Sequence, residues 1–576
     1  MKPRSLALFV ACSMALAPTA DAARKSRQPA TLADLAGRSA PLDRAAVVTA
    51  GAAQAAEGYQ AFLQIEGADP ALRAQALRRL GDLRLADAEA AIARDGGDAA
   101  VARDLAQQAI DAYRRLLDEQ PSSSAADSVL YQLARALELN GDAPGAAAVL
   151  DRLVTHHPQS AYFAEAQFRR GEAFFSKQRY ADAERAYAAV LSAGAASEFR
   201  EQAQYKFAWS LFKQNQDDAS VAAFLVLLDG LLVQDGAIRP ADQLARAEQE
   251  LADDALRALA ITFAANDGPP ALQASLARHG PAVYESRLYA ALGDLYVEKE
   301  RYQDAAEAYR AFARRQPMDP QAPLLLVRAT EAYAKGGFAS HVLDGKRQLA
   351  EGYGPGSAYW IAHAGQIDAA VSAAVQSGLL DLAKHHHALA QKGDAAAVER
   401  DAAIRWYRLY LEGFDSSPEA PATRLLLADL LFDGQRYEEA AVEYERTAYG
   451  YAGNPGASRA GYAALVAYAE AETRAPAPRR AEVSARAIES ALQFAATFPD
   501  HAETPGVLTR TAKALFDAGD RQRAESVAQR VLALGARADA GQQRVAWTVL
   551  AHTYFDAGRY AEAEVAYSEL ARRLPV

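Results

Sequence analysis

Two stretches far apart in the chain share one pattern of helix-forming and turn-forming residues. Residues 288–317 and 547–575 each read as a helix, a short turn, a second helix and then a proline. In both, a small residue is followed by an aromatic residue, a tyrosine, an alanine and a second tyrosine at the same spacing. These are Gly293, Tyr296, Tyr302, Ala305 and Tyr309 in the first stretch, and Ala551, Tyr554, Tyr560, Ala563 and Tyr567 in the second. One such unit cannot bury its apolar face alone, so the pattern predicts stacked helical hairpins.

The same spacing recurs over most of the chain. It fits residues 130–158, 168–191, 205–228, 425–447 and 509–531. Units that begin at Gly81, Leu379 and Tyr462 fit with a longer connection between their two helices. Residues 240–280 and 323–370 are helical in pattern, but no repeat register can be assigned to them. Small residues are expected where the two helices of a hairpin cross, because they let the backbones approach closely.

This pattern resembles the tetratricopeptide repeat, a helical hairpin of about 34 residues. The resemblance covers most of residues 50–575 and implies an all-α fold, a solenoid of antiparallel helical hairpins. We expect an N-terminal array in residues 41–320, starting near Pro41, and a C-terminal array in residues 376–576. Residues 321–375 are expected to form an irregular helical connection, so that two arrays in contact are as compatible with the pattern as one superhelix.

The first residues have the three parts of a secretory signal in order. Lys2 and Arg4 supply positive charge, residues 6–16 are apolar, and Ala20-Asp21-Ala22 is a small-x-small cleavage sequence. The pattern predicts a signal peptide in residues 1–22, a flexible lead-in in residues 23–40, and a periplasmic protein.

The only cysteine, Cys12, lies inside this predicted signal. Its context, Phe9-Val10-Ala11-Cys12, is a poor fit to a bacterial lipid-acceptor sequence, and the apolar run continues beyond it. A lipid anchor at Cys12, which would make the protein an outer-membrane lipoprotein, is therefore the alternative rather than the expectation.

Composition argues against nucleic acid and anionic membrane as partners. The formal net charge is −11, and binding to phosphate requires clustered lysine and arginine. The best apolar run, residues 221–233, is interrupted by Asp229 and is too short to cross a bilayer. We therefore expect no transmembrane segment in the mature chain.

No motif with catalytic spacing is present. His385-His386-His387 is the most conspicuous cluster, but adjacent residues of a helix point in different directions and cannot chelate one metal ion. Periplasmic lytic transglycosylases also carry a long α-superhelix, yet their activity resides in a separate domain, and here the repeat pattern continues to Pro575. We expect a protein that is not an enzyme and that uses no cofactor or metal.

The resemblance also implies where partners bind, because the first helix of each tetratricopeptide hairpin lines the concave groove. One residue after the signature aromatic or leucine, the chain carries a series of phenylalanines, interrupted by Val297. The series is Phe175, Phe212, Phe432, Phe516 and Phe555. It predicts an apolar ladder for a peptide or helix, and the alternative is that these rings pack between hairpins as core.

The other predicted groove residues are acidic or aromatic. They are Glu172, Asp294, Asp429, Trp209 and Tyr205. The lysines and asparagines with which chaperone-binding repeat proteins clamp a C-terminal carboxylate are missing, so a basic or apolar partner segment is expected.

Exported repeat arrays of this kind resemble several bacterial envelope components. These include the outer-membrane assembly lipoprotein of the Bam complex, the Tol–Pal cell-division coordinator and repeat proteins associated with TonB/Tol-like systems; residues 205–214 and 403–455 are most similar to the last group. The resemblance implies a periplasmic scaffold that binds other envelope proteins. The alternative is a helper protein associated with peptidoglycan or an exported polysaccharide, which would need aromatic platforms in a pocket.

Overall fold

The computed structural model describes residues 51–572 apart from 94–97, 122, 195–196 and 393–395. The predicted signal peptide and lead-in, Cys12 and the expected helix start near Pro41 lie outside these residues. Over the described residues the chain is built almost entirely from α-helices, labelled α2 to α27. The predicted all-α solenoid of helical hairpins is confirmed. None of these helices is both long enough and apolar enough to span a bilayer.

The chain divides into two compact units between Tyr162 and Phe163. In the first unit, each helix from α2 to α6 packs against the next. Their bounds are α2 Ala52–Leu63, α3 Pro70–Ala93, α4 Ala99–Glu119, α5 Ala126–Leu139 and α6 Ala143–His156. The helices α3 and α4 pack together as the hairpin that the sequence predicts after Gly81.

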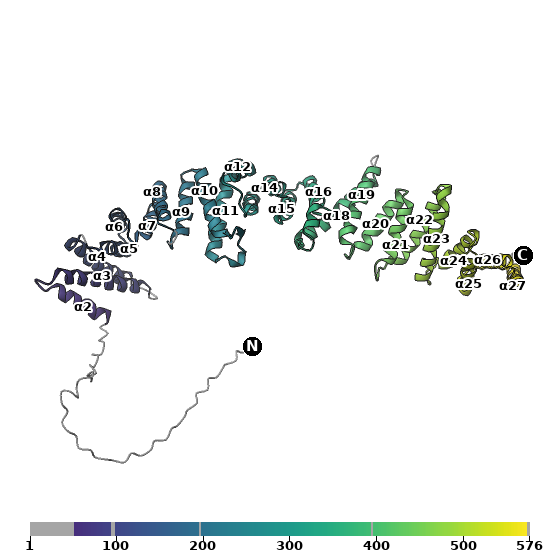
Figure 1. The fold of residues 1–576 in the computed structure, drawn as a ribbon, viewed down its shortest axis with the longest axis horizontal. Coiled ribbons are helices and arrows are strands. Elements are labelled where there is room, and N and C mark those ends of the chain that lie inside the picture. Colours follow the sequence, from purple (N-terminus) through teal and green to yellow (C-terminus); the bar gives the residue numbers. More distant parts are fainter. Residues whose placement is uncertain (1–50, 94–97, 122, 195–196, 393–395, 573–576) are drawn as a thin grey trace, which may run out of the picture. The chain divides into compact units, whose positions relative to one another are not determined.

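In the second unit, most helices again pack against the next one along the chain, and Figure 1 shows them following one another in chain order. The first helices of the unit are α7 Phe163–Ser176, α8 Tyr180–Ser192, α9 Arg200–Lys213, α10 Asp217–Leu232, α11 Arg246–Ala265, α12 Pro269–His279, α13 Glu285–Glu298, α14 Tyr302–Arg315, α15 Gln321–Lys335, α16 Ala339–Tyr353 and α17 Ala358–Ala362. The others are α18 Ala369–Ala390, α19 Ala396–Phe414, α20 Ala420–Asp433, α21 Tyr437–Tyr449, α22 Ala457–Arg474, α23 Ala477–Thr497, α24 Thr504–Asp517, α25 Arg521–Ala533, α26 Ala540–Asp556 and α27 Tyr560–Arg572.

The small residues of the repeat lie where the two helices of a hairpin cross, as predicted. A Cβ added at Gly81 would lie 2.6 Å from Cε1 of Tyr113, in the middle of a buried ring. A Cβ added at Gly171 would overlap the ring of Tyr187 in the same way, and one added at Gly293 would overlap the ring of Tyr309. The second tyrosine of the repeat therefore fills the space that the missing side chain leaves.

The turn inside each hairpin also repeats. The first helix of one hairpin ends at Ser176, Gln178 has a positive φ of 59°, and the amide of Arg179 donates to the carbonyl of Phe174 at 2.9 Å. This is a Schellman cap, which satisfies carbonyls that the end of a helix leaves free. Equivalent bonds run from Gln216 to Leu211, Arg301 to Tyr296, Arg436 to Leu431, Asp520 to Leu515 and Arg559 to Tyr554.

One hairpin departs from this scheme through an insertion between α10 and α11. Strands β1 (Val233–Gln234) and β2 (Ala237–Ile238) pair antiparallel, with Val233 opposite Ile238. Asp235 and Gly236, both with positive φ, form the tight turn between them. A short 3₁₀ turn, η1 (Ala241–Gln243), follows and leads into α11. A second 3₁₀ turn, η2 (Gly535–Arg537), lies between α25 and α26. The insertion shifts the spacing of the following helices, which explains why residues 240–280 fit no repeat register.

Residues 321–375, where the sequence predicts an irregular connection, contain α15, α16, α17 and the start of α18. In this region α15 packs against both α14 and α16, and α16 packs against α18. A buried apolar core extends from Ala208 to Tyr468 through this region. The predicted boundary between two arrays stays a prediction.

Candidate functional site

The predicted phenylalanines lie at the end of the first helix of their hairpins, beside the turn. Three of them stack edge-on against the tyrosine five residues later, which begins the second helix. The ring centroids are 5.3 Å apart for Phe175 and Tyr180, 5.0 Å for Phe432 and Tyr437, and 5.7 Å for Phe555 and Tyr560. These rings therefore help to close their own hairpins.

The other two phenylalanines of the series contact different groups. Phe212 packs edge-on against Trp209 with centroids 5.1 Å apart. The guanidinium of Arg521 lies 3.8 Å from the centroid of Phe516. Phe175, Phe212, Phe432 and Phe516 are half-buried, as is Val297 where the series is interrupted. Each of these rings thus packs within the protein and keeps part of its surface exposed. The predicted ladder stays a prediction.

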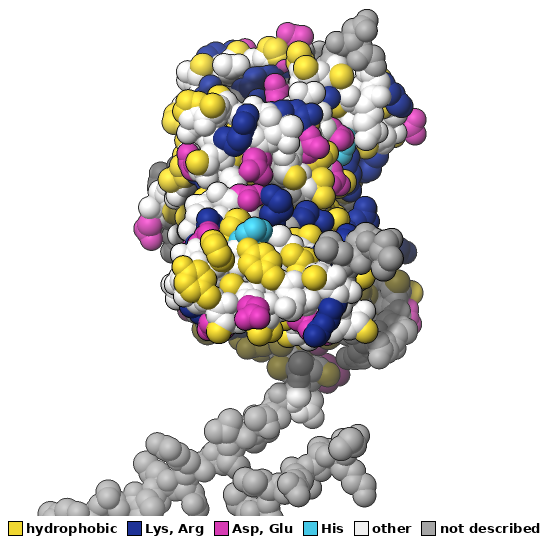
Figure 2. Space-filling view, turned by 90° about the vertical axis from the view of Figure 1, so that its right-hand side faces the viewer, with side chains coloured by type: hydrophobic (Ala, Val, Ile, Leu, Met, Phe, Trp, Pro, Cys, Tyr) yellow, Lys and Arg dark blue, Asp and Glu magenta, His cyan; other side chains and the backbone are white. Residues whose placement is uncertain are grey.

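Phe555 differs from the others in being 54% exposed. It lies in the last described hairpin, α26 and α27, where Tyr560 is 66% exposed. Figure 2 views this end of the second unit and shows hydrophobic side chains gathered around a histidine.

The predicted acidic groove residues accept hydrogen bonds within their own hairpins. Tyr309 donates to Asp294 at 2.6 Å and Tyr444 donates to Asp429 at 2.6 Å. Tyr187 donates to Glu172. Burial, together with the neighbouring Asp429 carboxylate, raises the pKa of Tyr444, and burial raises the pKa of Tyr309 to about 12. The tyrosines therefore remain protonated donors near neutral pH.

Two of these carboxylates also bind a cation of the following hairpin. Nζ of Lys206 lies 3.2 Å from Glu172, and Arg328 forms an ion pair with Asp294. Each of these two carboxylates thus binds both the tyrosine of its own hairpin and a cation on the first helix of the next hairpin. A partner's basic group would have to compete with these cations, which weakens the expectation that the acids alone attract a basic segment.

Trp209 and Tyr205 converge on one residue that sequence reasoning missed. The indole of Trp209 donates to Asp254 at 3.1 Å, and the hydroxyl of Tyr205 donates to the same carboxylate. Asp254 lies on α11, in the segment without a repeat register, so no spacing signal could have found it. These aromatic side chains are half-buried and tie α9 to α11.

The three adjacent histidines each make a different contact. His386 Nδ1 lies 2.5 Å from Glu399, His387 Nδ1 lies 3.1 Å from the hydroxyl of Tyr407, and His385 packs edge-on against His386. Burial lowers the pKa of His387. Over the residues that the structure covers, no three histidine, cysteine or acidic side chains are placed to hold a metal ion.

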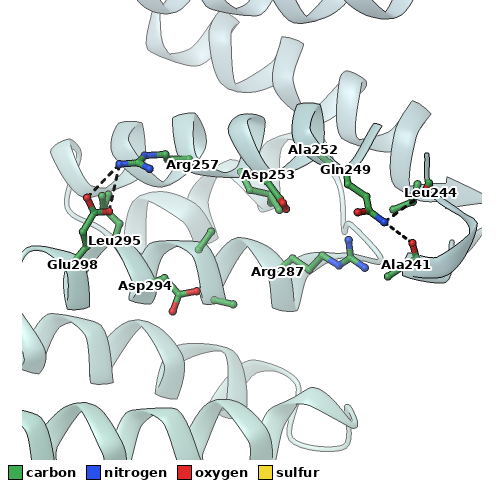
Figure 3. A pocket seen from close by; sticks show the side chains of 13 residues that line it. Ala241, Leu244, Gln249, Ala252, Asp253, Arg257, Arg287, Asp294, Leu295 and Glu298 are labelled. Atoms are coloured by element: carbon green, nitrogen blue, oxygen red, sulfur yellow. Dashed lines mark hydrogen bonds and ion pairs between the residues drawn. The ribbon is translucent and has the colours of Figure 1, made fainter. Parts of the chain in front are cut away.

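Open grooves lie along the first helices of successive hairpins. One, of about 430 Å³, is lined by α22, α23 and α24 and includes Tyr462, Leu465 and Val466. Another, of about 580 Å³, lies between α11 and α13 and is shown in Figure 3. We call the second the α11–α13 groove. Its apolar lining is Leu244, Ala252, Leu256, Ala290, Ala291 and Leu295.

The insertion after α10 is held at one end of the α11–α13 groove. Arg239 donates to the carbonyl of Leu231 at 2.8 Å and pairs with Glu248 at 3.1 Å. The side-chain amide of Gln249 donates to the carbonyl of Ala241 at 2.7 Å. These bonds fix the segment Ala241–Leu244 as a wall of the groove, as Figure 3 shows.

Acid is expected to loosen this wall. Hydrogen bonds from Arg239 and from the amide of Ala245 hold the pKa of Glu248 below its usual value of 4.5. Because the folded pKa is depressed, the stability that Glu248 contributes is fully present above about pH 4.5 and is lost as pH falls through the folded pKa. Hydrogen-exchange protection of residues 239–245 should therefore fall below pH 4.5. In Glu248→Gln it should be weak at all pH values, and equal pH profiles for both proteins would contradict the assignment.

Comparison with known proteins agrees with the repeat pattern over part of the chain. The family described as tetratricopeptide repeat matches residues 94–161, 131–198 and 290–332. These segments are tetratricopeptide repeats, and they include helices of both units. No curated protein matches the chain.

Solved structures similar to the chain include Naa15/Naa10 bound to HypK-THB, with 14% identity over 89% of this chain and a TM-score of 0.28. This chain spans 64% of that chain, less than two thirds of its length. Yeast Tom70 is 13% identical over 84% of this chain and 96% of its own, with a TM-score of 0.20. The TPR domain of P58(IPK) is 13% identical over 76% of this chain and 99% of its own, with a TM-score of 0.19. At these TM-scores the likeness carries no argument about function.

Proposed function

We propose that this protein is a non-catalytic scaffold of the bacterial cell envelope, which binds segments of partner proteins along the first helices of its tetratricopeptide hairpins. The observation that carries the proposal is a pair of grooves with largely apolar linings along successive first helices, one between α11 and α13 and one lined by α22, α23 and α24. Grooves of this kind suit an extended or helical segment, whose apolar side chains enter while its backbone stays outside.

The half-buried phenylalanines support the same function. Contacts within the protein hold these rings in place, so that little side-chain entropy is lost when a partner covers their exposed part. Burial raises the pKa of Tyr187, Tyr444 and Tyr407, but these groups do not suggest catalysis, because Tyr187 and Tyr444 donate to carboxylates of their own hairpins and Tyr407 is fully buried. We therefore propose a binding protein and not an enzyme.

Periplasmic location rests on residues 1–22, with Lys2 and Arg4 before an apolar run and Ala20-Asp21-Ala22 at its end. Mass spectrometry of the protein purified from its native envelope tests this directly. A mature N-terminus at Ala23 is expected. A lipid-modified Cys12 at the N-terminus would establish the lipoprotein alternative, and an intact Met1 would overturn export.

Partner capture tests the scaffold itself. Crosslinking in the native envelope followed by affinity purification is expected to recover a defined protein. The double variants Phe175→Ala/Phe212→Ala and Phe432→Ala/Phe555→Ala are expected to reduce recovery at least fivefold, about 1 kcal/mol, because truncating an apolar anchor typically costs that much or more.

The matched control is Val226→Ala/Val565→Ala. These valines lie on second helices and are 56% and 59% exposed, so their removal should leave recovery unchanged. Retention on peptidoglycan or polysaccharide with no specific protein would replace the scaffold with the polymer-associated alternative.

A further inference from the structure

The α11–α13 groove carries two unpaired charges of opposite sign, and we propose that it docks a partner segment that presents both a carboxylate and a cation beside small apolar side chains. The inference rests on the proposed scaffold function and names the chemistry of one of its binding sites. It concerns Asp253 on α11 and Arg287 on α13, neither of which the repeat pattern indicates.

The floor of the groove suits close approach of a backbone. Ala252, Ala290 and Ala291 contribute only methyl groups, and the other apolar lining residues Leu256 and Leu295 are buried, 7% and 9% exposed. Alanines at the contact surface let a segment lie near the helix axes, so its own alanine or leucine side chains fill the space.

Both ends of the groove are bounded. At one end stands the wall Ala241–Leu244, held by Gln249 and Arg239. At the other, Arg257 of α11 pairs with Glu298 of α13 at 3.3 Å and bridges the two helices, as the dashed lines in Figure 3 mark. The space of about 580 Å³ between these ends accommodates a few residues of a partner rather than a long run.

The charges inside the groove are not equivalent. Arg257 is paired with Glu298, while Asp294 accepts a hydrogen bond from Tyr309 and pairs with Arg328. Within the described part of the chain, the side chains of Asp253 and Arg287 have neither an ion pair nor a hydrogen bond. In Figure 3, Arg287 extends toward Gln249 at the walled end, and Asp253 lies farther along on the opposite helix.

Two free charges of opposite sign favour a ligand that carries both signs. A small anion would pair with Arg287 alone, and a cation would pair with Asp253 alone. A segment that carries one acidic and one basic side chain satisfies both groups at once. On a helix, side chains four residues apart lie on one face about 6 Å apart, and in an extended segment those two residues apart do so.

Peptide binding to the full-length protein tests the proposal. The probes are fluorescein-labelled 14-residue peptides of alanine and leucine that carry Glu/Lys, Glu/Gln, Gln/Lys or Gln/Gln at spacings of two and four. Fluorescence anisotropy is expected to show that a Glu/Lys peptide binds most tightly. Replacing either charged residue of the peptide with Gln should raise Kd about fivefold, as for partly exposed ion pairs. One order of Glu and Lys in the peptide is enough, because the peptide can lie in the groove in either chain direction.

Two variants assign the charges. In Arg287→Gln, the Glu/Lys and Gln/Lys peptides should bind equally, and in Asp253→Asn the Glu/Lys and Glu/Gln peptides should bind equally. This double-mutant cycle isolates each pair. Arg246→Gln is the control, because Arg246 lies on the same helix with its side chain 92% exposed and does not line the groove. It should leave the ranking unchanged.

Three results would overturn the inference: no peptide binds, the Gln/Gln peptide binds as tightly as the Glu/Lys peptide, or the variants do not change the ranking. If partner capture from the envelope succeeds while any of these is found, the scaffold stands and only the chemistry assigned to this groove falls. If capture also fails, the proposed function falls with it.

Discussion

Replacing Arg424 with methionine is expected to destabilise the region of α20 and α21 by about 3–5 kcal/mol, the usual cost of removing one partner from a buried ion pair. Arg424 is 7% exposed and Glu443, its partner on α21, is 8% exposed. Arg424 also donates to Asp415 at 2.7 Å and to the hydroxyl of Tyr451 at 2.7 Å. One guanidinium thus joins α20, α21 and the loops before and after this hairpin.

The size of the effect comes from the carboxylate that remains. The Glu443 side chain would remain in a buried site without its main partner, with only Arg446 left beside it at 3.2 Å. The double variant Arg424→Met/Glu443→Gln removes both charges, so it is expected to be more stable than the single variant even though it changes more residues. Urea unfolding gives the free energies, and hydrogen exchange in α20 and α21 locates the loss, because repeat arrays unfold in parts. A single variant within 1 kcal/mol of wild type would mean that water reaches Glu443.

Replacing Gly293 with valine is expected to cost about 3 kcal/mol, the upper part of the range for overpacking a well-packed core. A Cβ at this position would overlap the ring of Tyr309, which is 2% exposed and hydrogen-bonded to Asp294. The ring cannot move aside without losing that bond, and a β-branched side chain adds two further carbons at the crossing.

A matched control separates this clash from helix propensity. Gly230 lies on α10 and an added Cβ there would meet nothing within 4 Å, so Gly230→Val should be neutral or stabilising by a few tenths of a kcal/mol. Gly293→Ala should cost less than Gly293→Val, since another hairpin has a fully buried alanine, Ala428, at the equivalent repeat position. Thermal and urea unfolding of the three variants compare them, and equal loss in Gly293→Val and Gly230→Val would refute the role of the tyrosine.

For the hairpins that follow the repeat spacing, the sequence alone was enough to predict where the two helices cross. Gly171 and Gly293 were expected at helix crossings, and both face a buried tyrosine. The stretched unit after Gly81 was also paired correctly with its second helix, because Gly81 meets Tyr113. Gly171 and Gly293 each precede their tyrosine by the same interval in the chain, so contacts of this kind leave a periodic mark in the sequence.

The candidate site was less predictable. The phenylalanine series and the acids were found from their repeat positions, but the repeat pattern gave no sign that Asp294 already binds Tyr309 and Arg328. Arg287 and Asp253 were missed, since a charged residue on an exposed helix face has no distinguishing pattern. Whether such a residue can bind a partner depends on whether a neighbouring side chain already pairs with its charge, and only the tertiary structure shows that.

The sequence by itself determined the all-α class and the hairpin as the repeating unit, because helix period, small crossing residues and turn chemistry are local properties. Only the tertiary structure decided which side chains meet across an insertion or between hairpins. Asp254 receives Tyr205 and Trp209 from 49 and 45 residues away, across the β1–β2 insertion. Such contacts depend on how much chain each connection contains, and an irregular insertion removes the fixed spacing from which a partner could be inferred.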